Sequence, residues 1–198
     1  MRFFLISEGA EAKIYKGKID GIEVIKKTRH RKIYRRKEID EEIRRRRTKR
    51  EAVCLYRAIE SGIKVPRLIA LGKFTIIMTF EKGKLLKDLD EKEKEKWLDK
   101  CGSMLAKLHE SGIAHGDYTP ANIIIGESPC IIDFGLAEIT KDIEQMAIDL
   151  LLMKRSLKSR HFNIFIKAYK WKRSEEAIKR MKKIEAMGRY QARTLANL

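Results

Sequence analysis

Hydrophobic and polar residues alternate over the first 26 positions, a pattern typical of β-strands. Apolar side chains recur within residues 3–6, 12–15 and 21–26, and short glycine-containing segments separate these runs. Gly9 lies in the first connection, and Asp20-Gly21 in the second has the composition of a tight hairpin turn. The pattern therefore predicts a strand, a loop containing Gly9, a second strand, a hairpin turn and a third strand.

The rest of the chain combines helical periodicity with further strands, which predicts an α+β fold. Helices are predicted over residues 40–61, 90–111, 143–157 and 174–187, and Gly62 and Gly112 suit the left-handed caps of the first two. Strands are predicted over 68–71 and 73–80, and the tail from Gly188 is expected to be mobile. The predicted inward residues are Thr48, Ala52, Leu55, Tyr56 and Ile59 in the first helix and Leu98, Cys101, Leu105 and Leu108 in the second.

The charge of the chain points to a polyanionic partner. Its 198 residues carry a formal net charge of +17, yet 43% of them are hydrophobic, which indicates a folded basic protein. Residues 26–50 contain fourteen Lys or Arg against four acids, a local net charge of +10. Such density favours an RNA phosphate backbone over an acidic protein surface or a merely solvated helix face. The sequence contains no motif for reading bases.

The cysteines and the apolar runs indicate in which cellular compartment the protein is expected. Cys54, Cys101 and Cys130 are odd in number and lack CxxC spacing, which indicates reduced thiols inside a cell. No apolar run approaches the ~18 residues of a membrane span, so a cytoplasmic, soluble protein with no membrane partner is expected.

Two short acidic motifs occupy the middle of the chain. Residues 115–122 read H-G-D-x-x-x-x-N and residues 133–135 read D-F-G, each after an apolar run. Either motif alone is usually a turn or loop, but their order and spacing match the catalytic and metal loops of protein-kinase-like phosphotransferases. Asp117, Asn122 and Asp133 are therefore predicted to converge on a magnesium nucleotide.

The N-terminal part supplies candidates for the remaining elements of such a site. Only Gly9 matches the G-x-G-x-x-G pattern of a phosphate-binding loop. The loop is therefore either a phosphate-binding loop or an ordinary hairpin turn. Residues 23–26 align with the V-A-I-K pattern, which favours Lys26 over Lys27 as the phosphate-binding lysine. Glu51 is the acid best placed to turn inward and hold that lysine, the alternative being an exposed partner of Arg47.

The second half of the chain lacks parts that a full-size protein kinase has. The backbone of Thr79, Phe80 and Glu81 falls at the position of a hinge that binds adenine, which predicts an N-lobe over 1–82 and a C-lobe over 83–198. No A-P-E motif follows Gly135, and thirteen residues separate it from Asp149. A loop that docks a peptide substrate is therefore missing or very short.

These residues resemble the small kinase/ATPase subunit of the KEOPS complex, a family akin to RIO atypical kinases. The resemblance rests on residues 47–51, 115–122, 133–137 and 147–150 and covers essentially the whole chain. It implies a trimmed two-lobed kinase that binds ATP and Mg²⁺ and joins a complex making threonylcarbamoyladenosine in tRNA. It also implies a threonylcarbamoyl transferase subunit as direct partner, a small subunit at the N-lobe, and tRNA on the basic surface of residues 26–50 and the C-terminal tail.

The resemblance also implies roles for individual residues. Lys26, held by Glu51, would meet the α- and β-phosphates, and Asp133 and Asn122 would bind Mg²⁺. Asp117 would orient the nucleophile and accept its proton, leaving His115 as a scaffold of the loop. The nucleophile is a serine or threonine hydroxyl, including one of the chain's own, or water. A RIO-type protein kinase in ribosome assembly and a pseudokinase scaffold are the alternatives.

Overall fold

The computed structural model describes residues 2–196, with side chains described over residues 2–187. Its first element is a five-stranded antiparallel sheet of order β1-β2-β3-β5-β4, with edge strands β1 and β4. The strands are β1 (Phe3–Glu8), β2 (Ala12–Ile19), β3 (Ile22–Arg29), β4 (Leu68–Leu71) and β5 (Thr75–Thr79). Ile19 pairs with Ile22, so Asp20 and Gly21 form a two-residue turn, and both have the positive φ of a type I′ hairpin.

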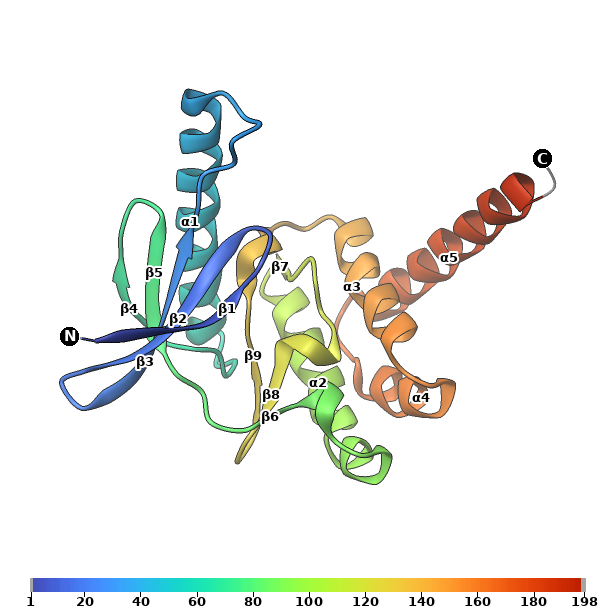
Figure 1. The fold of residues 1–198 in the computed structure, drawn as a ribbon. Helices are drawn as coiled ribbons and strands as arrows, with labels where there is room; N and C mark the ends of the chain where they lie inside the picture. Colours follow the sequence, from blue (N-terminus) through green and yellow to red (C-terminus); the bar gives the residue numbers. More distant parts are fainter. Residues whose placement is uncertain (1, 197–198) are drawn as a thin grey trace.

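Helix α1 (Lys37–Glu60) lies against this sheet and contacts β4 and β5 (Figure 1). Its end is a Schellman motif, in which Gly62 N–H donates to Ile59 O and Ile63 N–H donates to Ala58 O. Gly62 has φ +65°, which confirms its predicted role as a left-handed cap. The helix begins three residues before the predicted start, and Tyr56, predicted to face inward, is 59% exposed.

After β5 the chain builds a second part around α2 (Glu91–Glu110) and several short strands. A three-stranded sheet of order β6-β8-β9 joins β6 (Lys84–Leu85), β8 (Ile123–Ile125) and β9 (Pro129–Ile131). β7 (Ile113–Ala114) pairs with β10 (Glu138–Ile139). Three 3₁₀ turns complete this part: η1 (Leu86–Asp88), η2 (Pro120–Asn122) and η3 (Phe134–Leu136). Asp90 caps α2 by accepting the Glu93 N–H at 2.9 Å, which fixes where the helix begins.

Three helices close the chain: α3 (Ile143–Ser156), α4 (Ser159–Ala168) and α5 (Ser174–Ala196). α4 packs on α2 and α5 packs on α3, and α5 extends away from the rest of the molecule (Figure 1). The predicted mobile tail from Gly188 falls where side chains lie outside the described part, although its backbone continues α5 to Ala196.

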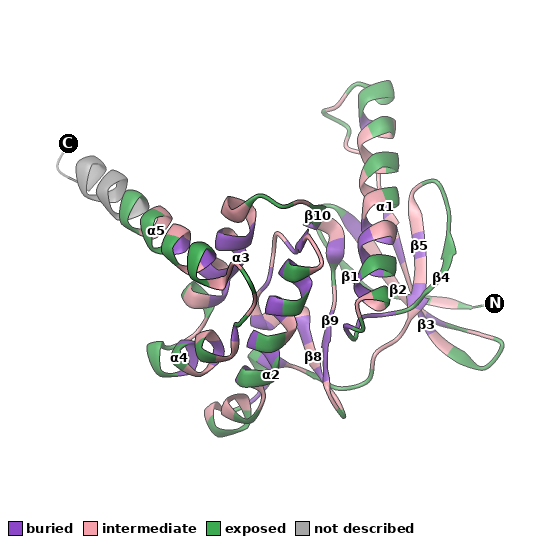
Figure 2. Cartoon of the chain, turned by 180° about the vertical axis from the view of Figure 1, so that it is seen from behind, coloured by how far each residue is buried: buried purple, intermediate pink, exposed green. Residues whose placement is uncertain are grey.

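One cluster of buried apolar side chains runs from α1 and β5 through β8 and β9 to α2, α3 and α5 (Figure 2). The inward residues predicted for α2 all belong to it, and the predicted α+β class is confirmed. Cys54, Cys101 and Cys130 are free and buried. Among the helices that the structure describes, none has the length and apolarity needed to cross a bilayer.

Candidate active site

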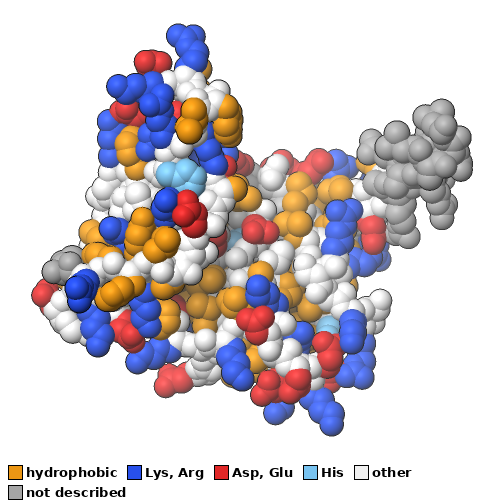
Figure 3. Space-filling model, viewed as in Figure 1, with side chains coloured by type: hydrophobic (Ala, Val, Ile, Leu, Met, Phe, Trp, Pro, Cys, Tyr) orange, Lys and Arg blue, Asp and Glu red, His pale blue; other side chains and the backbone are white. Residues whose placement is uncertain are grey.

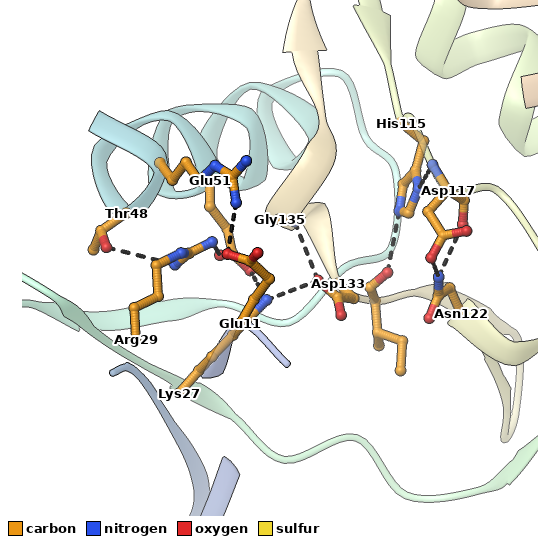
Figure 4. A network of polar contacts seen from close by, with 12 residues as sticks. Glu11, Lys27, Arg29, Thr48, Glu51, His115, Asp117, Asn122, Asp133 and Gly135 are labelled. Atoms are coloured by element: carbon orange, nitrogen blue, oxygen red, sulfur yellow. Dashed lines mark hydrogen bonds and ion pairs between the residues drawn. The ribbon is translucent and has the colours of Figure 1, made fainter. Parts of the chain in front are cut away.

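Lys27, in β3, is the lysine that the fold directs into the cleft. Its Nζ lies 2.7 Å from Glu51 Oε1 in α1 and 2.7 Å from Asp133 Oδ1. Figure 4 shows Lys27 between these two carboxylates. The prediction that Glu51 pairs with Lys26 is wrong. Lys26 Nζ instead lies 4.7 Å and 4.6 Å from the ring centres of Phe3 and Tyr15. Successive strand residues point to opposite faces, so a shift of one position exchanges one lysine for the other.

Glu51 turns inward as predicted and holds two cations. Besides Lys27, it accepts a hydrogen bond from Arg29 Nη2 to Oε2 at 2.6 Å. All three side chains are almost completely buried. A buried charge is costly unless it is paired, so the two cations and Glu51 depend on one another. Arg29 was not predicted, although its position two residues after Lys27 places it on the same face of the strand.

Burial and ion pairing shift the pKa of Lys27 in opposite directions. Burial alone would lower the pKa of this amine, but the charges of Glu51 and Asp133 and their hydrogen bonds outweigh it, and the pKa is raised. The amine is therefore charged at every pH at which the protein is expected to work.

Asp117 and Asn122 are joined directly in the loop between β7 and β8. Asn122 Nδ2 donates to the backbone oxygen of Asp117 at 2.9 Å and to its Oδ2 at 2.8 Å. These bonds leave Asn122 Oδ1 as the amide atom that can serve a cation. The 3₁₀ turn η2, which begins at Pro120, brings the two residues together.

Asp133 has a left-handed backbone, with φ 61° and ψ 71°, at the start of η3. This unusual conformation for a non-glycine residue is held by the Gly135 N–H, which donates to Asp133 Oδ1 at 3.1 Å. Burial would raise the pKa of Asp133, but Lys27 and this N–H reverse the effect, so the pKa is lowered. The carboxylate is therefore ionised near neutral pH.

Ile132 ties the Asp117 loop to the Asp133 loop. Its N–H donates to Asn122 O at 2.9 Å, and its carbonyl accepts from His115 Nε2 at 3.1 Å. The structure thus brings together Asp117, Asn122 and Asp133, which lie up to sixteen residues apart in sequence.

His115 is buried and acts within the protein rather than toward the cleft. Its Nδ1 accepts the Asp117 N–H at 3.3 Å, and its ring packs edge-on against Phe134 at 4.9 Å between centres. Burial lowers its pKa despite the opposing charge of Asp149 and the bond to the Ile132 carbonyl. A neutral imidazole with its proton on Nε2 satisfies both bonds, which agrees with the scaffold role predicted for His115.

Asp149 in α3 holds the loop that contains His115 and Asp117. No pattern in the sequence indicated this role by itself. Its carboxylate accepts the N–H groups of His115 at 2.6 Å and Gly116 at 2.8 Å. A third partner, His109 Nε2, lies 3.1 Å away, and Asp149 is completely buried. Gly116 has φ +77° and lies against Leu136, so this turn has no space for a side chain.

Two connected chambers form the cleft between the five-stranded sheet and the second part. An apolar chamber of about 240 Å³ is lined by Ile14, Ile25, Met78, Ile124 and Ile132, together with the predicted hinge residues Thr79, Phe80 and Glu81. A polar chamber of about 330 Å³ is lined by Gly9, Glu11, Arg29, Arg47 and Asp117, among others. Lys27, Asp133 and Ile14 line both chambers, so the ion pair of Lys27 and Asp133 lies where they meet.

The donors near Asp133 suit a Mg²⁺ ion that shares its ligands with a nucleotide. Mg²⁺ prefers oxygen and commonly takes one or two protein ligands, with phosphates and water completing its shell. The Asp133 carboxylate lines both chambers, and Asn122 is bonded through its backbone to the neighbouring Ile132, so these two residues are the candidates for such a pair. Within the described residues, no group of three or more His, Cys, Asp or Glu side chains is placed to hold a metal.

Comparisons with known proteins show the family to which the chain belongs. A model of the RIO domain matches residues 7–154. The chain is 40% identical over 214 residues to the KEOPS complex subunit Bud32 of Pyrococcus abyssi, which covers 96% of this chain and 97% of that protein. It is 37% identical over 196 residues to a probable bifunctional tRNA threonylcarbamoyladenosine biosynthesis protein of Methanococcus maripaludis, and there spans 94% of this chain but only 36% of that protein.

Among solved structures, the Rio2 kinase of Chaetomium thermophilum in complex with ADP, Mg²⁺ and phosphoaspartate superposes with a TM-score of 0.66. The two sequences are 18% identical, and the match covers 98% of this chain and 70% of that one. This likeness and the site geometry define a molecule with a protein-kinase-like fold. The chain belongs to the RIO-domain family, and within it to the relatives of the KEOPS subunit Bud32.

Proposed function

We propose that this chain is an ATP-dependent phosphotransferase or ATPase that works as a subunit of a KEOPS complex and supports threonylcarbamoyladenosine modification of tRNA. The observation that carries the proposal is the position of the Lys27–Asp133 ion pair at the junction of an apolar and a polar chamber. A nucleoside triphosphate has the same division, an apolar base followed by charged phosphates. The names of the relatives supply the complex and the modification.

We propose that adenine binds in the apolar chamber against the backbone of residues 79–81. Thr79 N–H donates to Arg67 O at 2.9 Å and Phe80 N–H donates to Glu23 O at 3.0 Å, so both donors are engaged in the fold. Glu81 N–H and the Thr79 carbonyl are the groups that we assign to the base. The predicted lobes 1–82 and 83–198 would then form the two walls of the site.

We assign the α- and β-phosphates to Lys27, held by Glu51. Mg²⁺, held by Asp133 and Asn122, would neutralise charge on the phosphates when it is bound. Asp117 would align the acceptor and take its proton, since it is half-exposed and Asn122 fixes its carboxylate. Because these groups are already paired and oriented, catalysis would come from placement and electrostatics.

Water is the acceptor that the short segment after Gly135 favours. That segment contains η3 and β10, and β10 is paired to β7 immediately before the Asp117 loop. This short segment leaves little chain for docking a peptide, whereas water needs no docking surface. A serine or threonine hydroxyl, including one of the chain's own, is the alternative acceptor.

The basic segment supports RNA as a partner, besides the transferase subunit and the small subunit that the resemblance implies. Figure 3 shows Lys and Arg side chains over the N-terminal end of α1, with hydrophobic side chains among them. Ile33 and Tyr34 are 94% and 77% exposed there, and the Arg35 guanidinium lies 5.2 Å from the Tyr34 ring centre. Cations that bind phosphates next to an exposed aromatic ring suit single-stranded RNA. We place the complex in the cytoplasm.

Release and transfer of phosphate from γ-labelled ATP test the proposal. The chain is assayed alone and then with the transferase subunit and tRNA. We expect tRNA-stimulated phosphate release that Asp117→Asn and Asp133→Ala abolish. Label appearing on a protein, unaffected by the transferase, would indicate a RIO-type protein kinase instead. Failure to bind Mg-ATP at millimolar concentration would indicate a scaffold.

A further inference from the structure

An ion pair closes the polar chamber from the side of the glycine-containing loop. The loop of residues 9–11 joins β1 to β2, and Glu11 Oε2 lies 2.6 Å from Arg47 Nη1 in α1. Figure 4 shows the Glu11 carboxylate turned toward the group formed by Lys27, Arg29 and Glu51. Lys32 Nζ contacts Ala10 O and holds the same loop. Glu11 thus adds a third acidic side chain, besides Asp117 and Asp133, to the chamber that Lys27, Arg29 and Arg47 also line.

Arg47 differs from the other two cations of the chamber in the partner that it has. Lys27 and Arg29 are both bonded to Glu51, which is 1% exposed and belongs to the rigid helix α1. Arg47 is paired with Glu11, whose side chain is 51% exposed and lies on a short loop. Exposed ion pairs contribute little, whereas an arginine forms strong paired bonds with phosphate. Arg47 is therefore the cation whose present partner a phosphate can replace.

The position of Arg47 indicates which phosphate it would meet. Lys27 and Asp133 line both chambers, but Arg47 and Glu11 line only the polar one. With adenine in the apolar chamber, Arg47 lies beyond Lys27 along the path of the phosphates. The group that reaches this position is the terminal phosphate of a triphosphate, which a diphosphate lacks.

We infer that Arg47 is a further phosphate-binding residue, specific for the terminal phosphate of a nucleoside triphosphate, and that Glu11 occupies it until that phosphate enters. This inference rests on the proposed nucleotide site. The incoming phosphate repels the Glu11 carboxylate and takes over its bonds to Arg47. The loop is then released from α1, so the site distinguishes a triphosphate from a diphosphate through one arginine.

Binding affinities for Mg-ADP and for the non-hydrolysable Mg-β,γ-imido-ATP test the inference. The full chain is titrated by calorimetry as wild type and as the variants Arg47→Gln, Arg47→Lys and Glu11→Gln. We expect Arg47→Gln to weaken the triphosphate about 10-fold and the diphosphate less than about twofold, because one charge-assisted phosphate contact is lost. Arg47→Lys should recover part of the loss. Glu11→Gln should tighten the triphosphate by up to about fivefold, since a weak competing ion pair is removed.

Arg50→Gln is the matched control. Arg50 lies one turn after Arg47 in α1 and pairs with Glu138 at 2.7 Å, but it does not line either chamber. We expect it to leave both affinities unchanged. An Arg47→Gln variant that weakens both nucleotides equally, or neither, would overturn the role of Arg47 while leaving the nucleotide site intact. A wild-type chain that binds neither nucleotide would reject the proposed site and this inference with it.

Discussion

Lys27 and Glu51 form a buried ion pair across 24 residues of sequence, with Nζ 2.7 Å from Oε1. The pair fixes the reach of the lysine, because Glu51 belongs to α1 and α1 is packed against the sheet. From this position Lys27 also meets Asp133, so the sheet, the helix and the second part of the molecule converge on one amine.

Substituting each of the two neighbouring lysines of β3 in turn tests which of them belongs to the site. Lys27→Met is expected to lower kcat/KM for ATP by about 100-fold, as loss of one positioned charge typically does. Arg29 still pairs with Glu51, so the variant should fold. Lys26→Met is the matched control and should change the rate less than about twofold. Steady-state phosphate release measures both, and a larger loss in the Lys26 variant would contradict the assignment.

Protonation of His115 should make the folded chain less stable in mild acid. Its folded pKa lies below the ordinary value of 6.5, so the unfolded chain takes up the proton first as the pH falls. The free energy of unfolding should therefore decrease below pH 6.5, by at most about 1.4 kcal/mol per pH unit from this group. Urea unfolding at a series of pH values measures the slope. His115→Gln should reduce it, and an unchanged slope would exclude His115 as its source.

Substitution by alanine should destabilise the protein at Gly102 but not at Gly9. A Cβ at Gly102 would lie 2.1 Å from Phe165 O, so Gly102→Ala forces α2 and α4 apart and should cost about 1–3 kcal/mol or more of unfolding free energy. A Cβ at Gly9 would lie 3.7 Å from Ala12 O, an ordinary contact, so stability should change by less than about 0.5 kcal/mol.

Nucleotide affinity then tests the phosphate-binding role predicted for Gly9. If phosphates approach the loop backbone closely, Gly9→Ala should weaken Mg-ATP binding while the melting temperature stays unchanged. Equal affinity for the variant and the wild type would assign Gly9 to an ordinary turn.

The basic end of α1 should contribute to tRNA binding through phosphate contacts. Arg31→Ala and Arg36→Ala remove exposed cations from the segment that precedes α1 and contains Tyr34. Each lost contact should lower the slope of log affinity against log salt by about 0.7–0.9. Lys92→Ala and Lys96→Ala, exposed positions on α2, are controls of equal charge. Fluorescence anisotropy with labelled tRNA measures the slopes, and equal losses in both sets would leave no preferred surface.

The elements that were predictable from the sequence are those with strong local signals. Helix caps at Gly62 and Gly112, the Asp20-Gly21 turn and the apolar stripe of α2 each depend on neighbours in sequence, and the structure contains them. The grouping of Asp117, Asn122 and Asp133 was also predictable, because their motifs follow apolar strands at a characteristic spacing.

The choice between Lys26 and Lys27 was not settled by local pattern. The two lysines are adjacent in sequence, and the strand faces differ by a single register step. The face of β3 that meets the cleft carries Ile25, Lys27 and Arg29. Had Arg29 been recognised as part of that face, Lys27 would have been the preferred lysine. The contacts of Asp149 and the Glu11–Arg47 pair could not be predicted from the sequence for another reason. Each joins segments more than 30 residues apart, and only the packing of the helices brings them together.

Dependence of ATP binding on Mg²⁺ tests the central claim most directly, because it reports whether Asp133, Asn122 and a nucleotide share one ion. We expect the wild-type chain to bind ATP more tightly with Mg²⁺ than with a chelator present, and Asp133→Ala to bind ATP with the same affinity in both conditions. A wild-type affinity that does not depend on Mg²⁺, or an Asp133→Ala variant with the full dependence, would contradict the account.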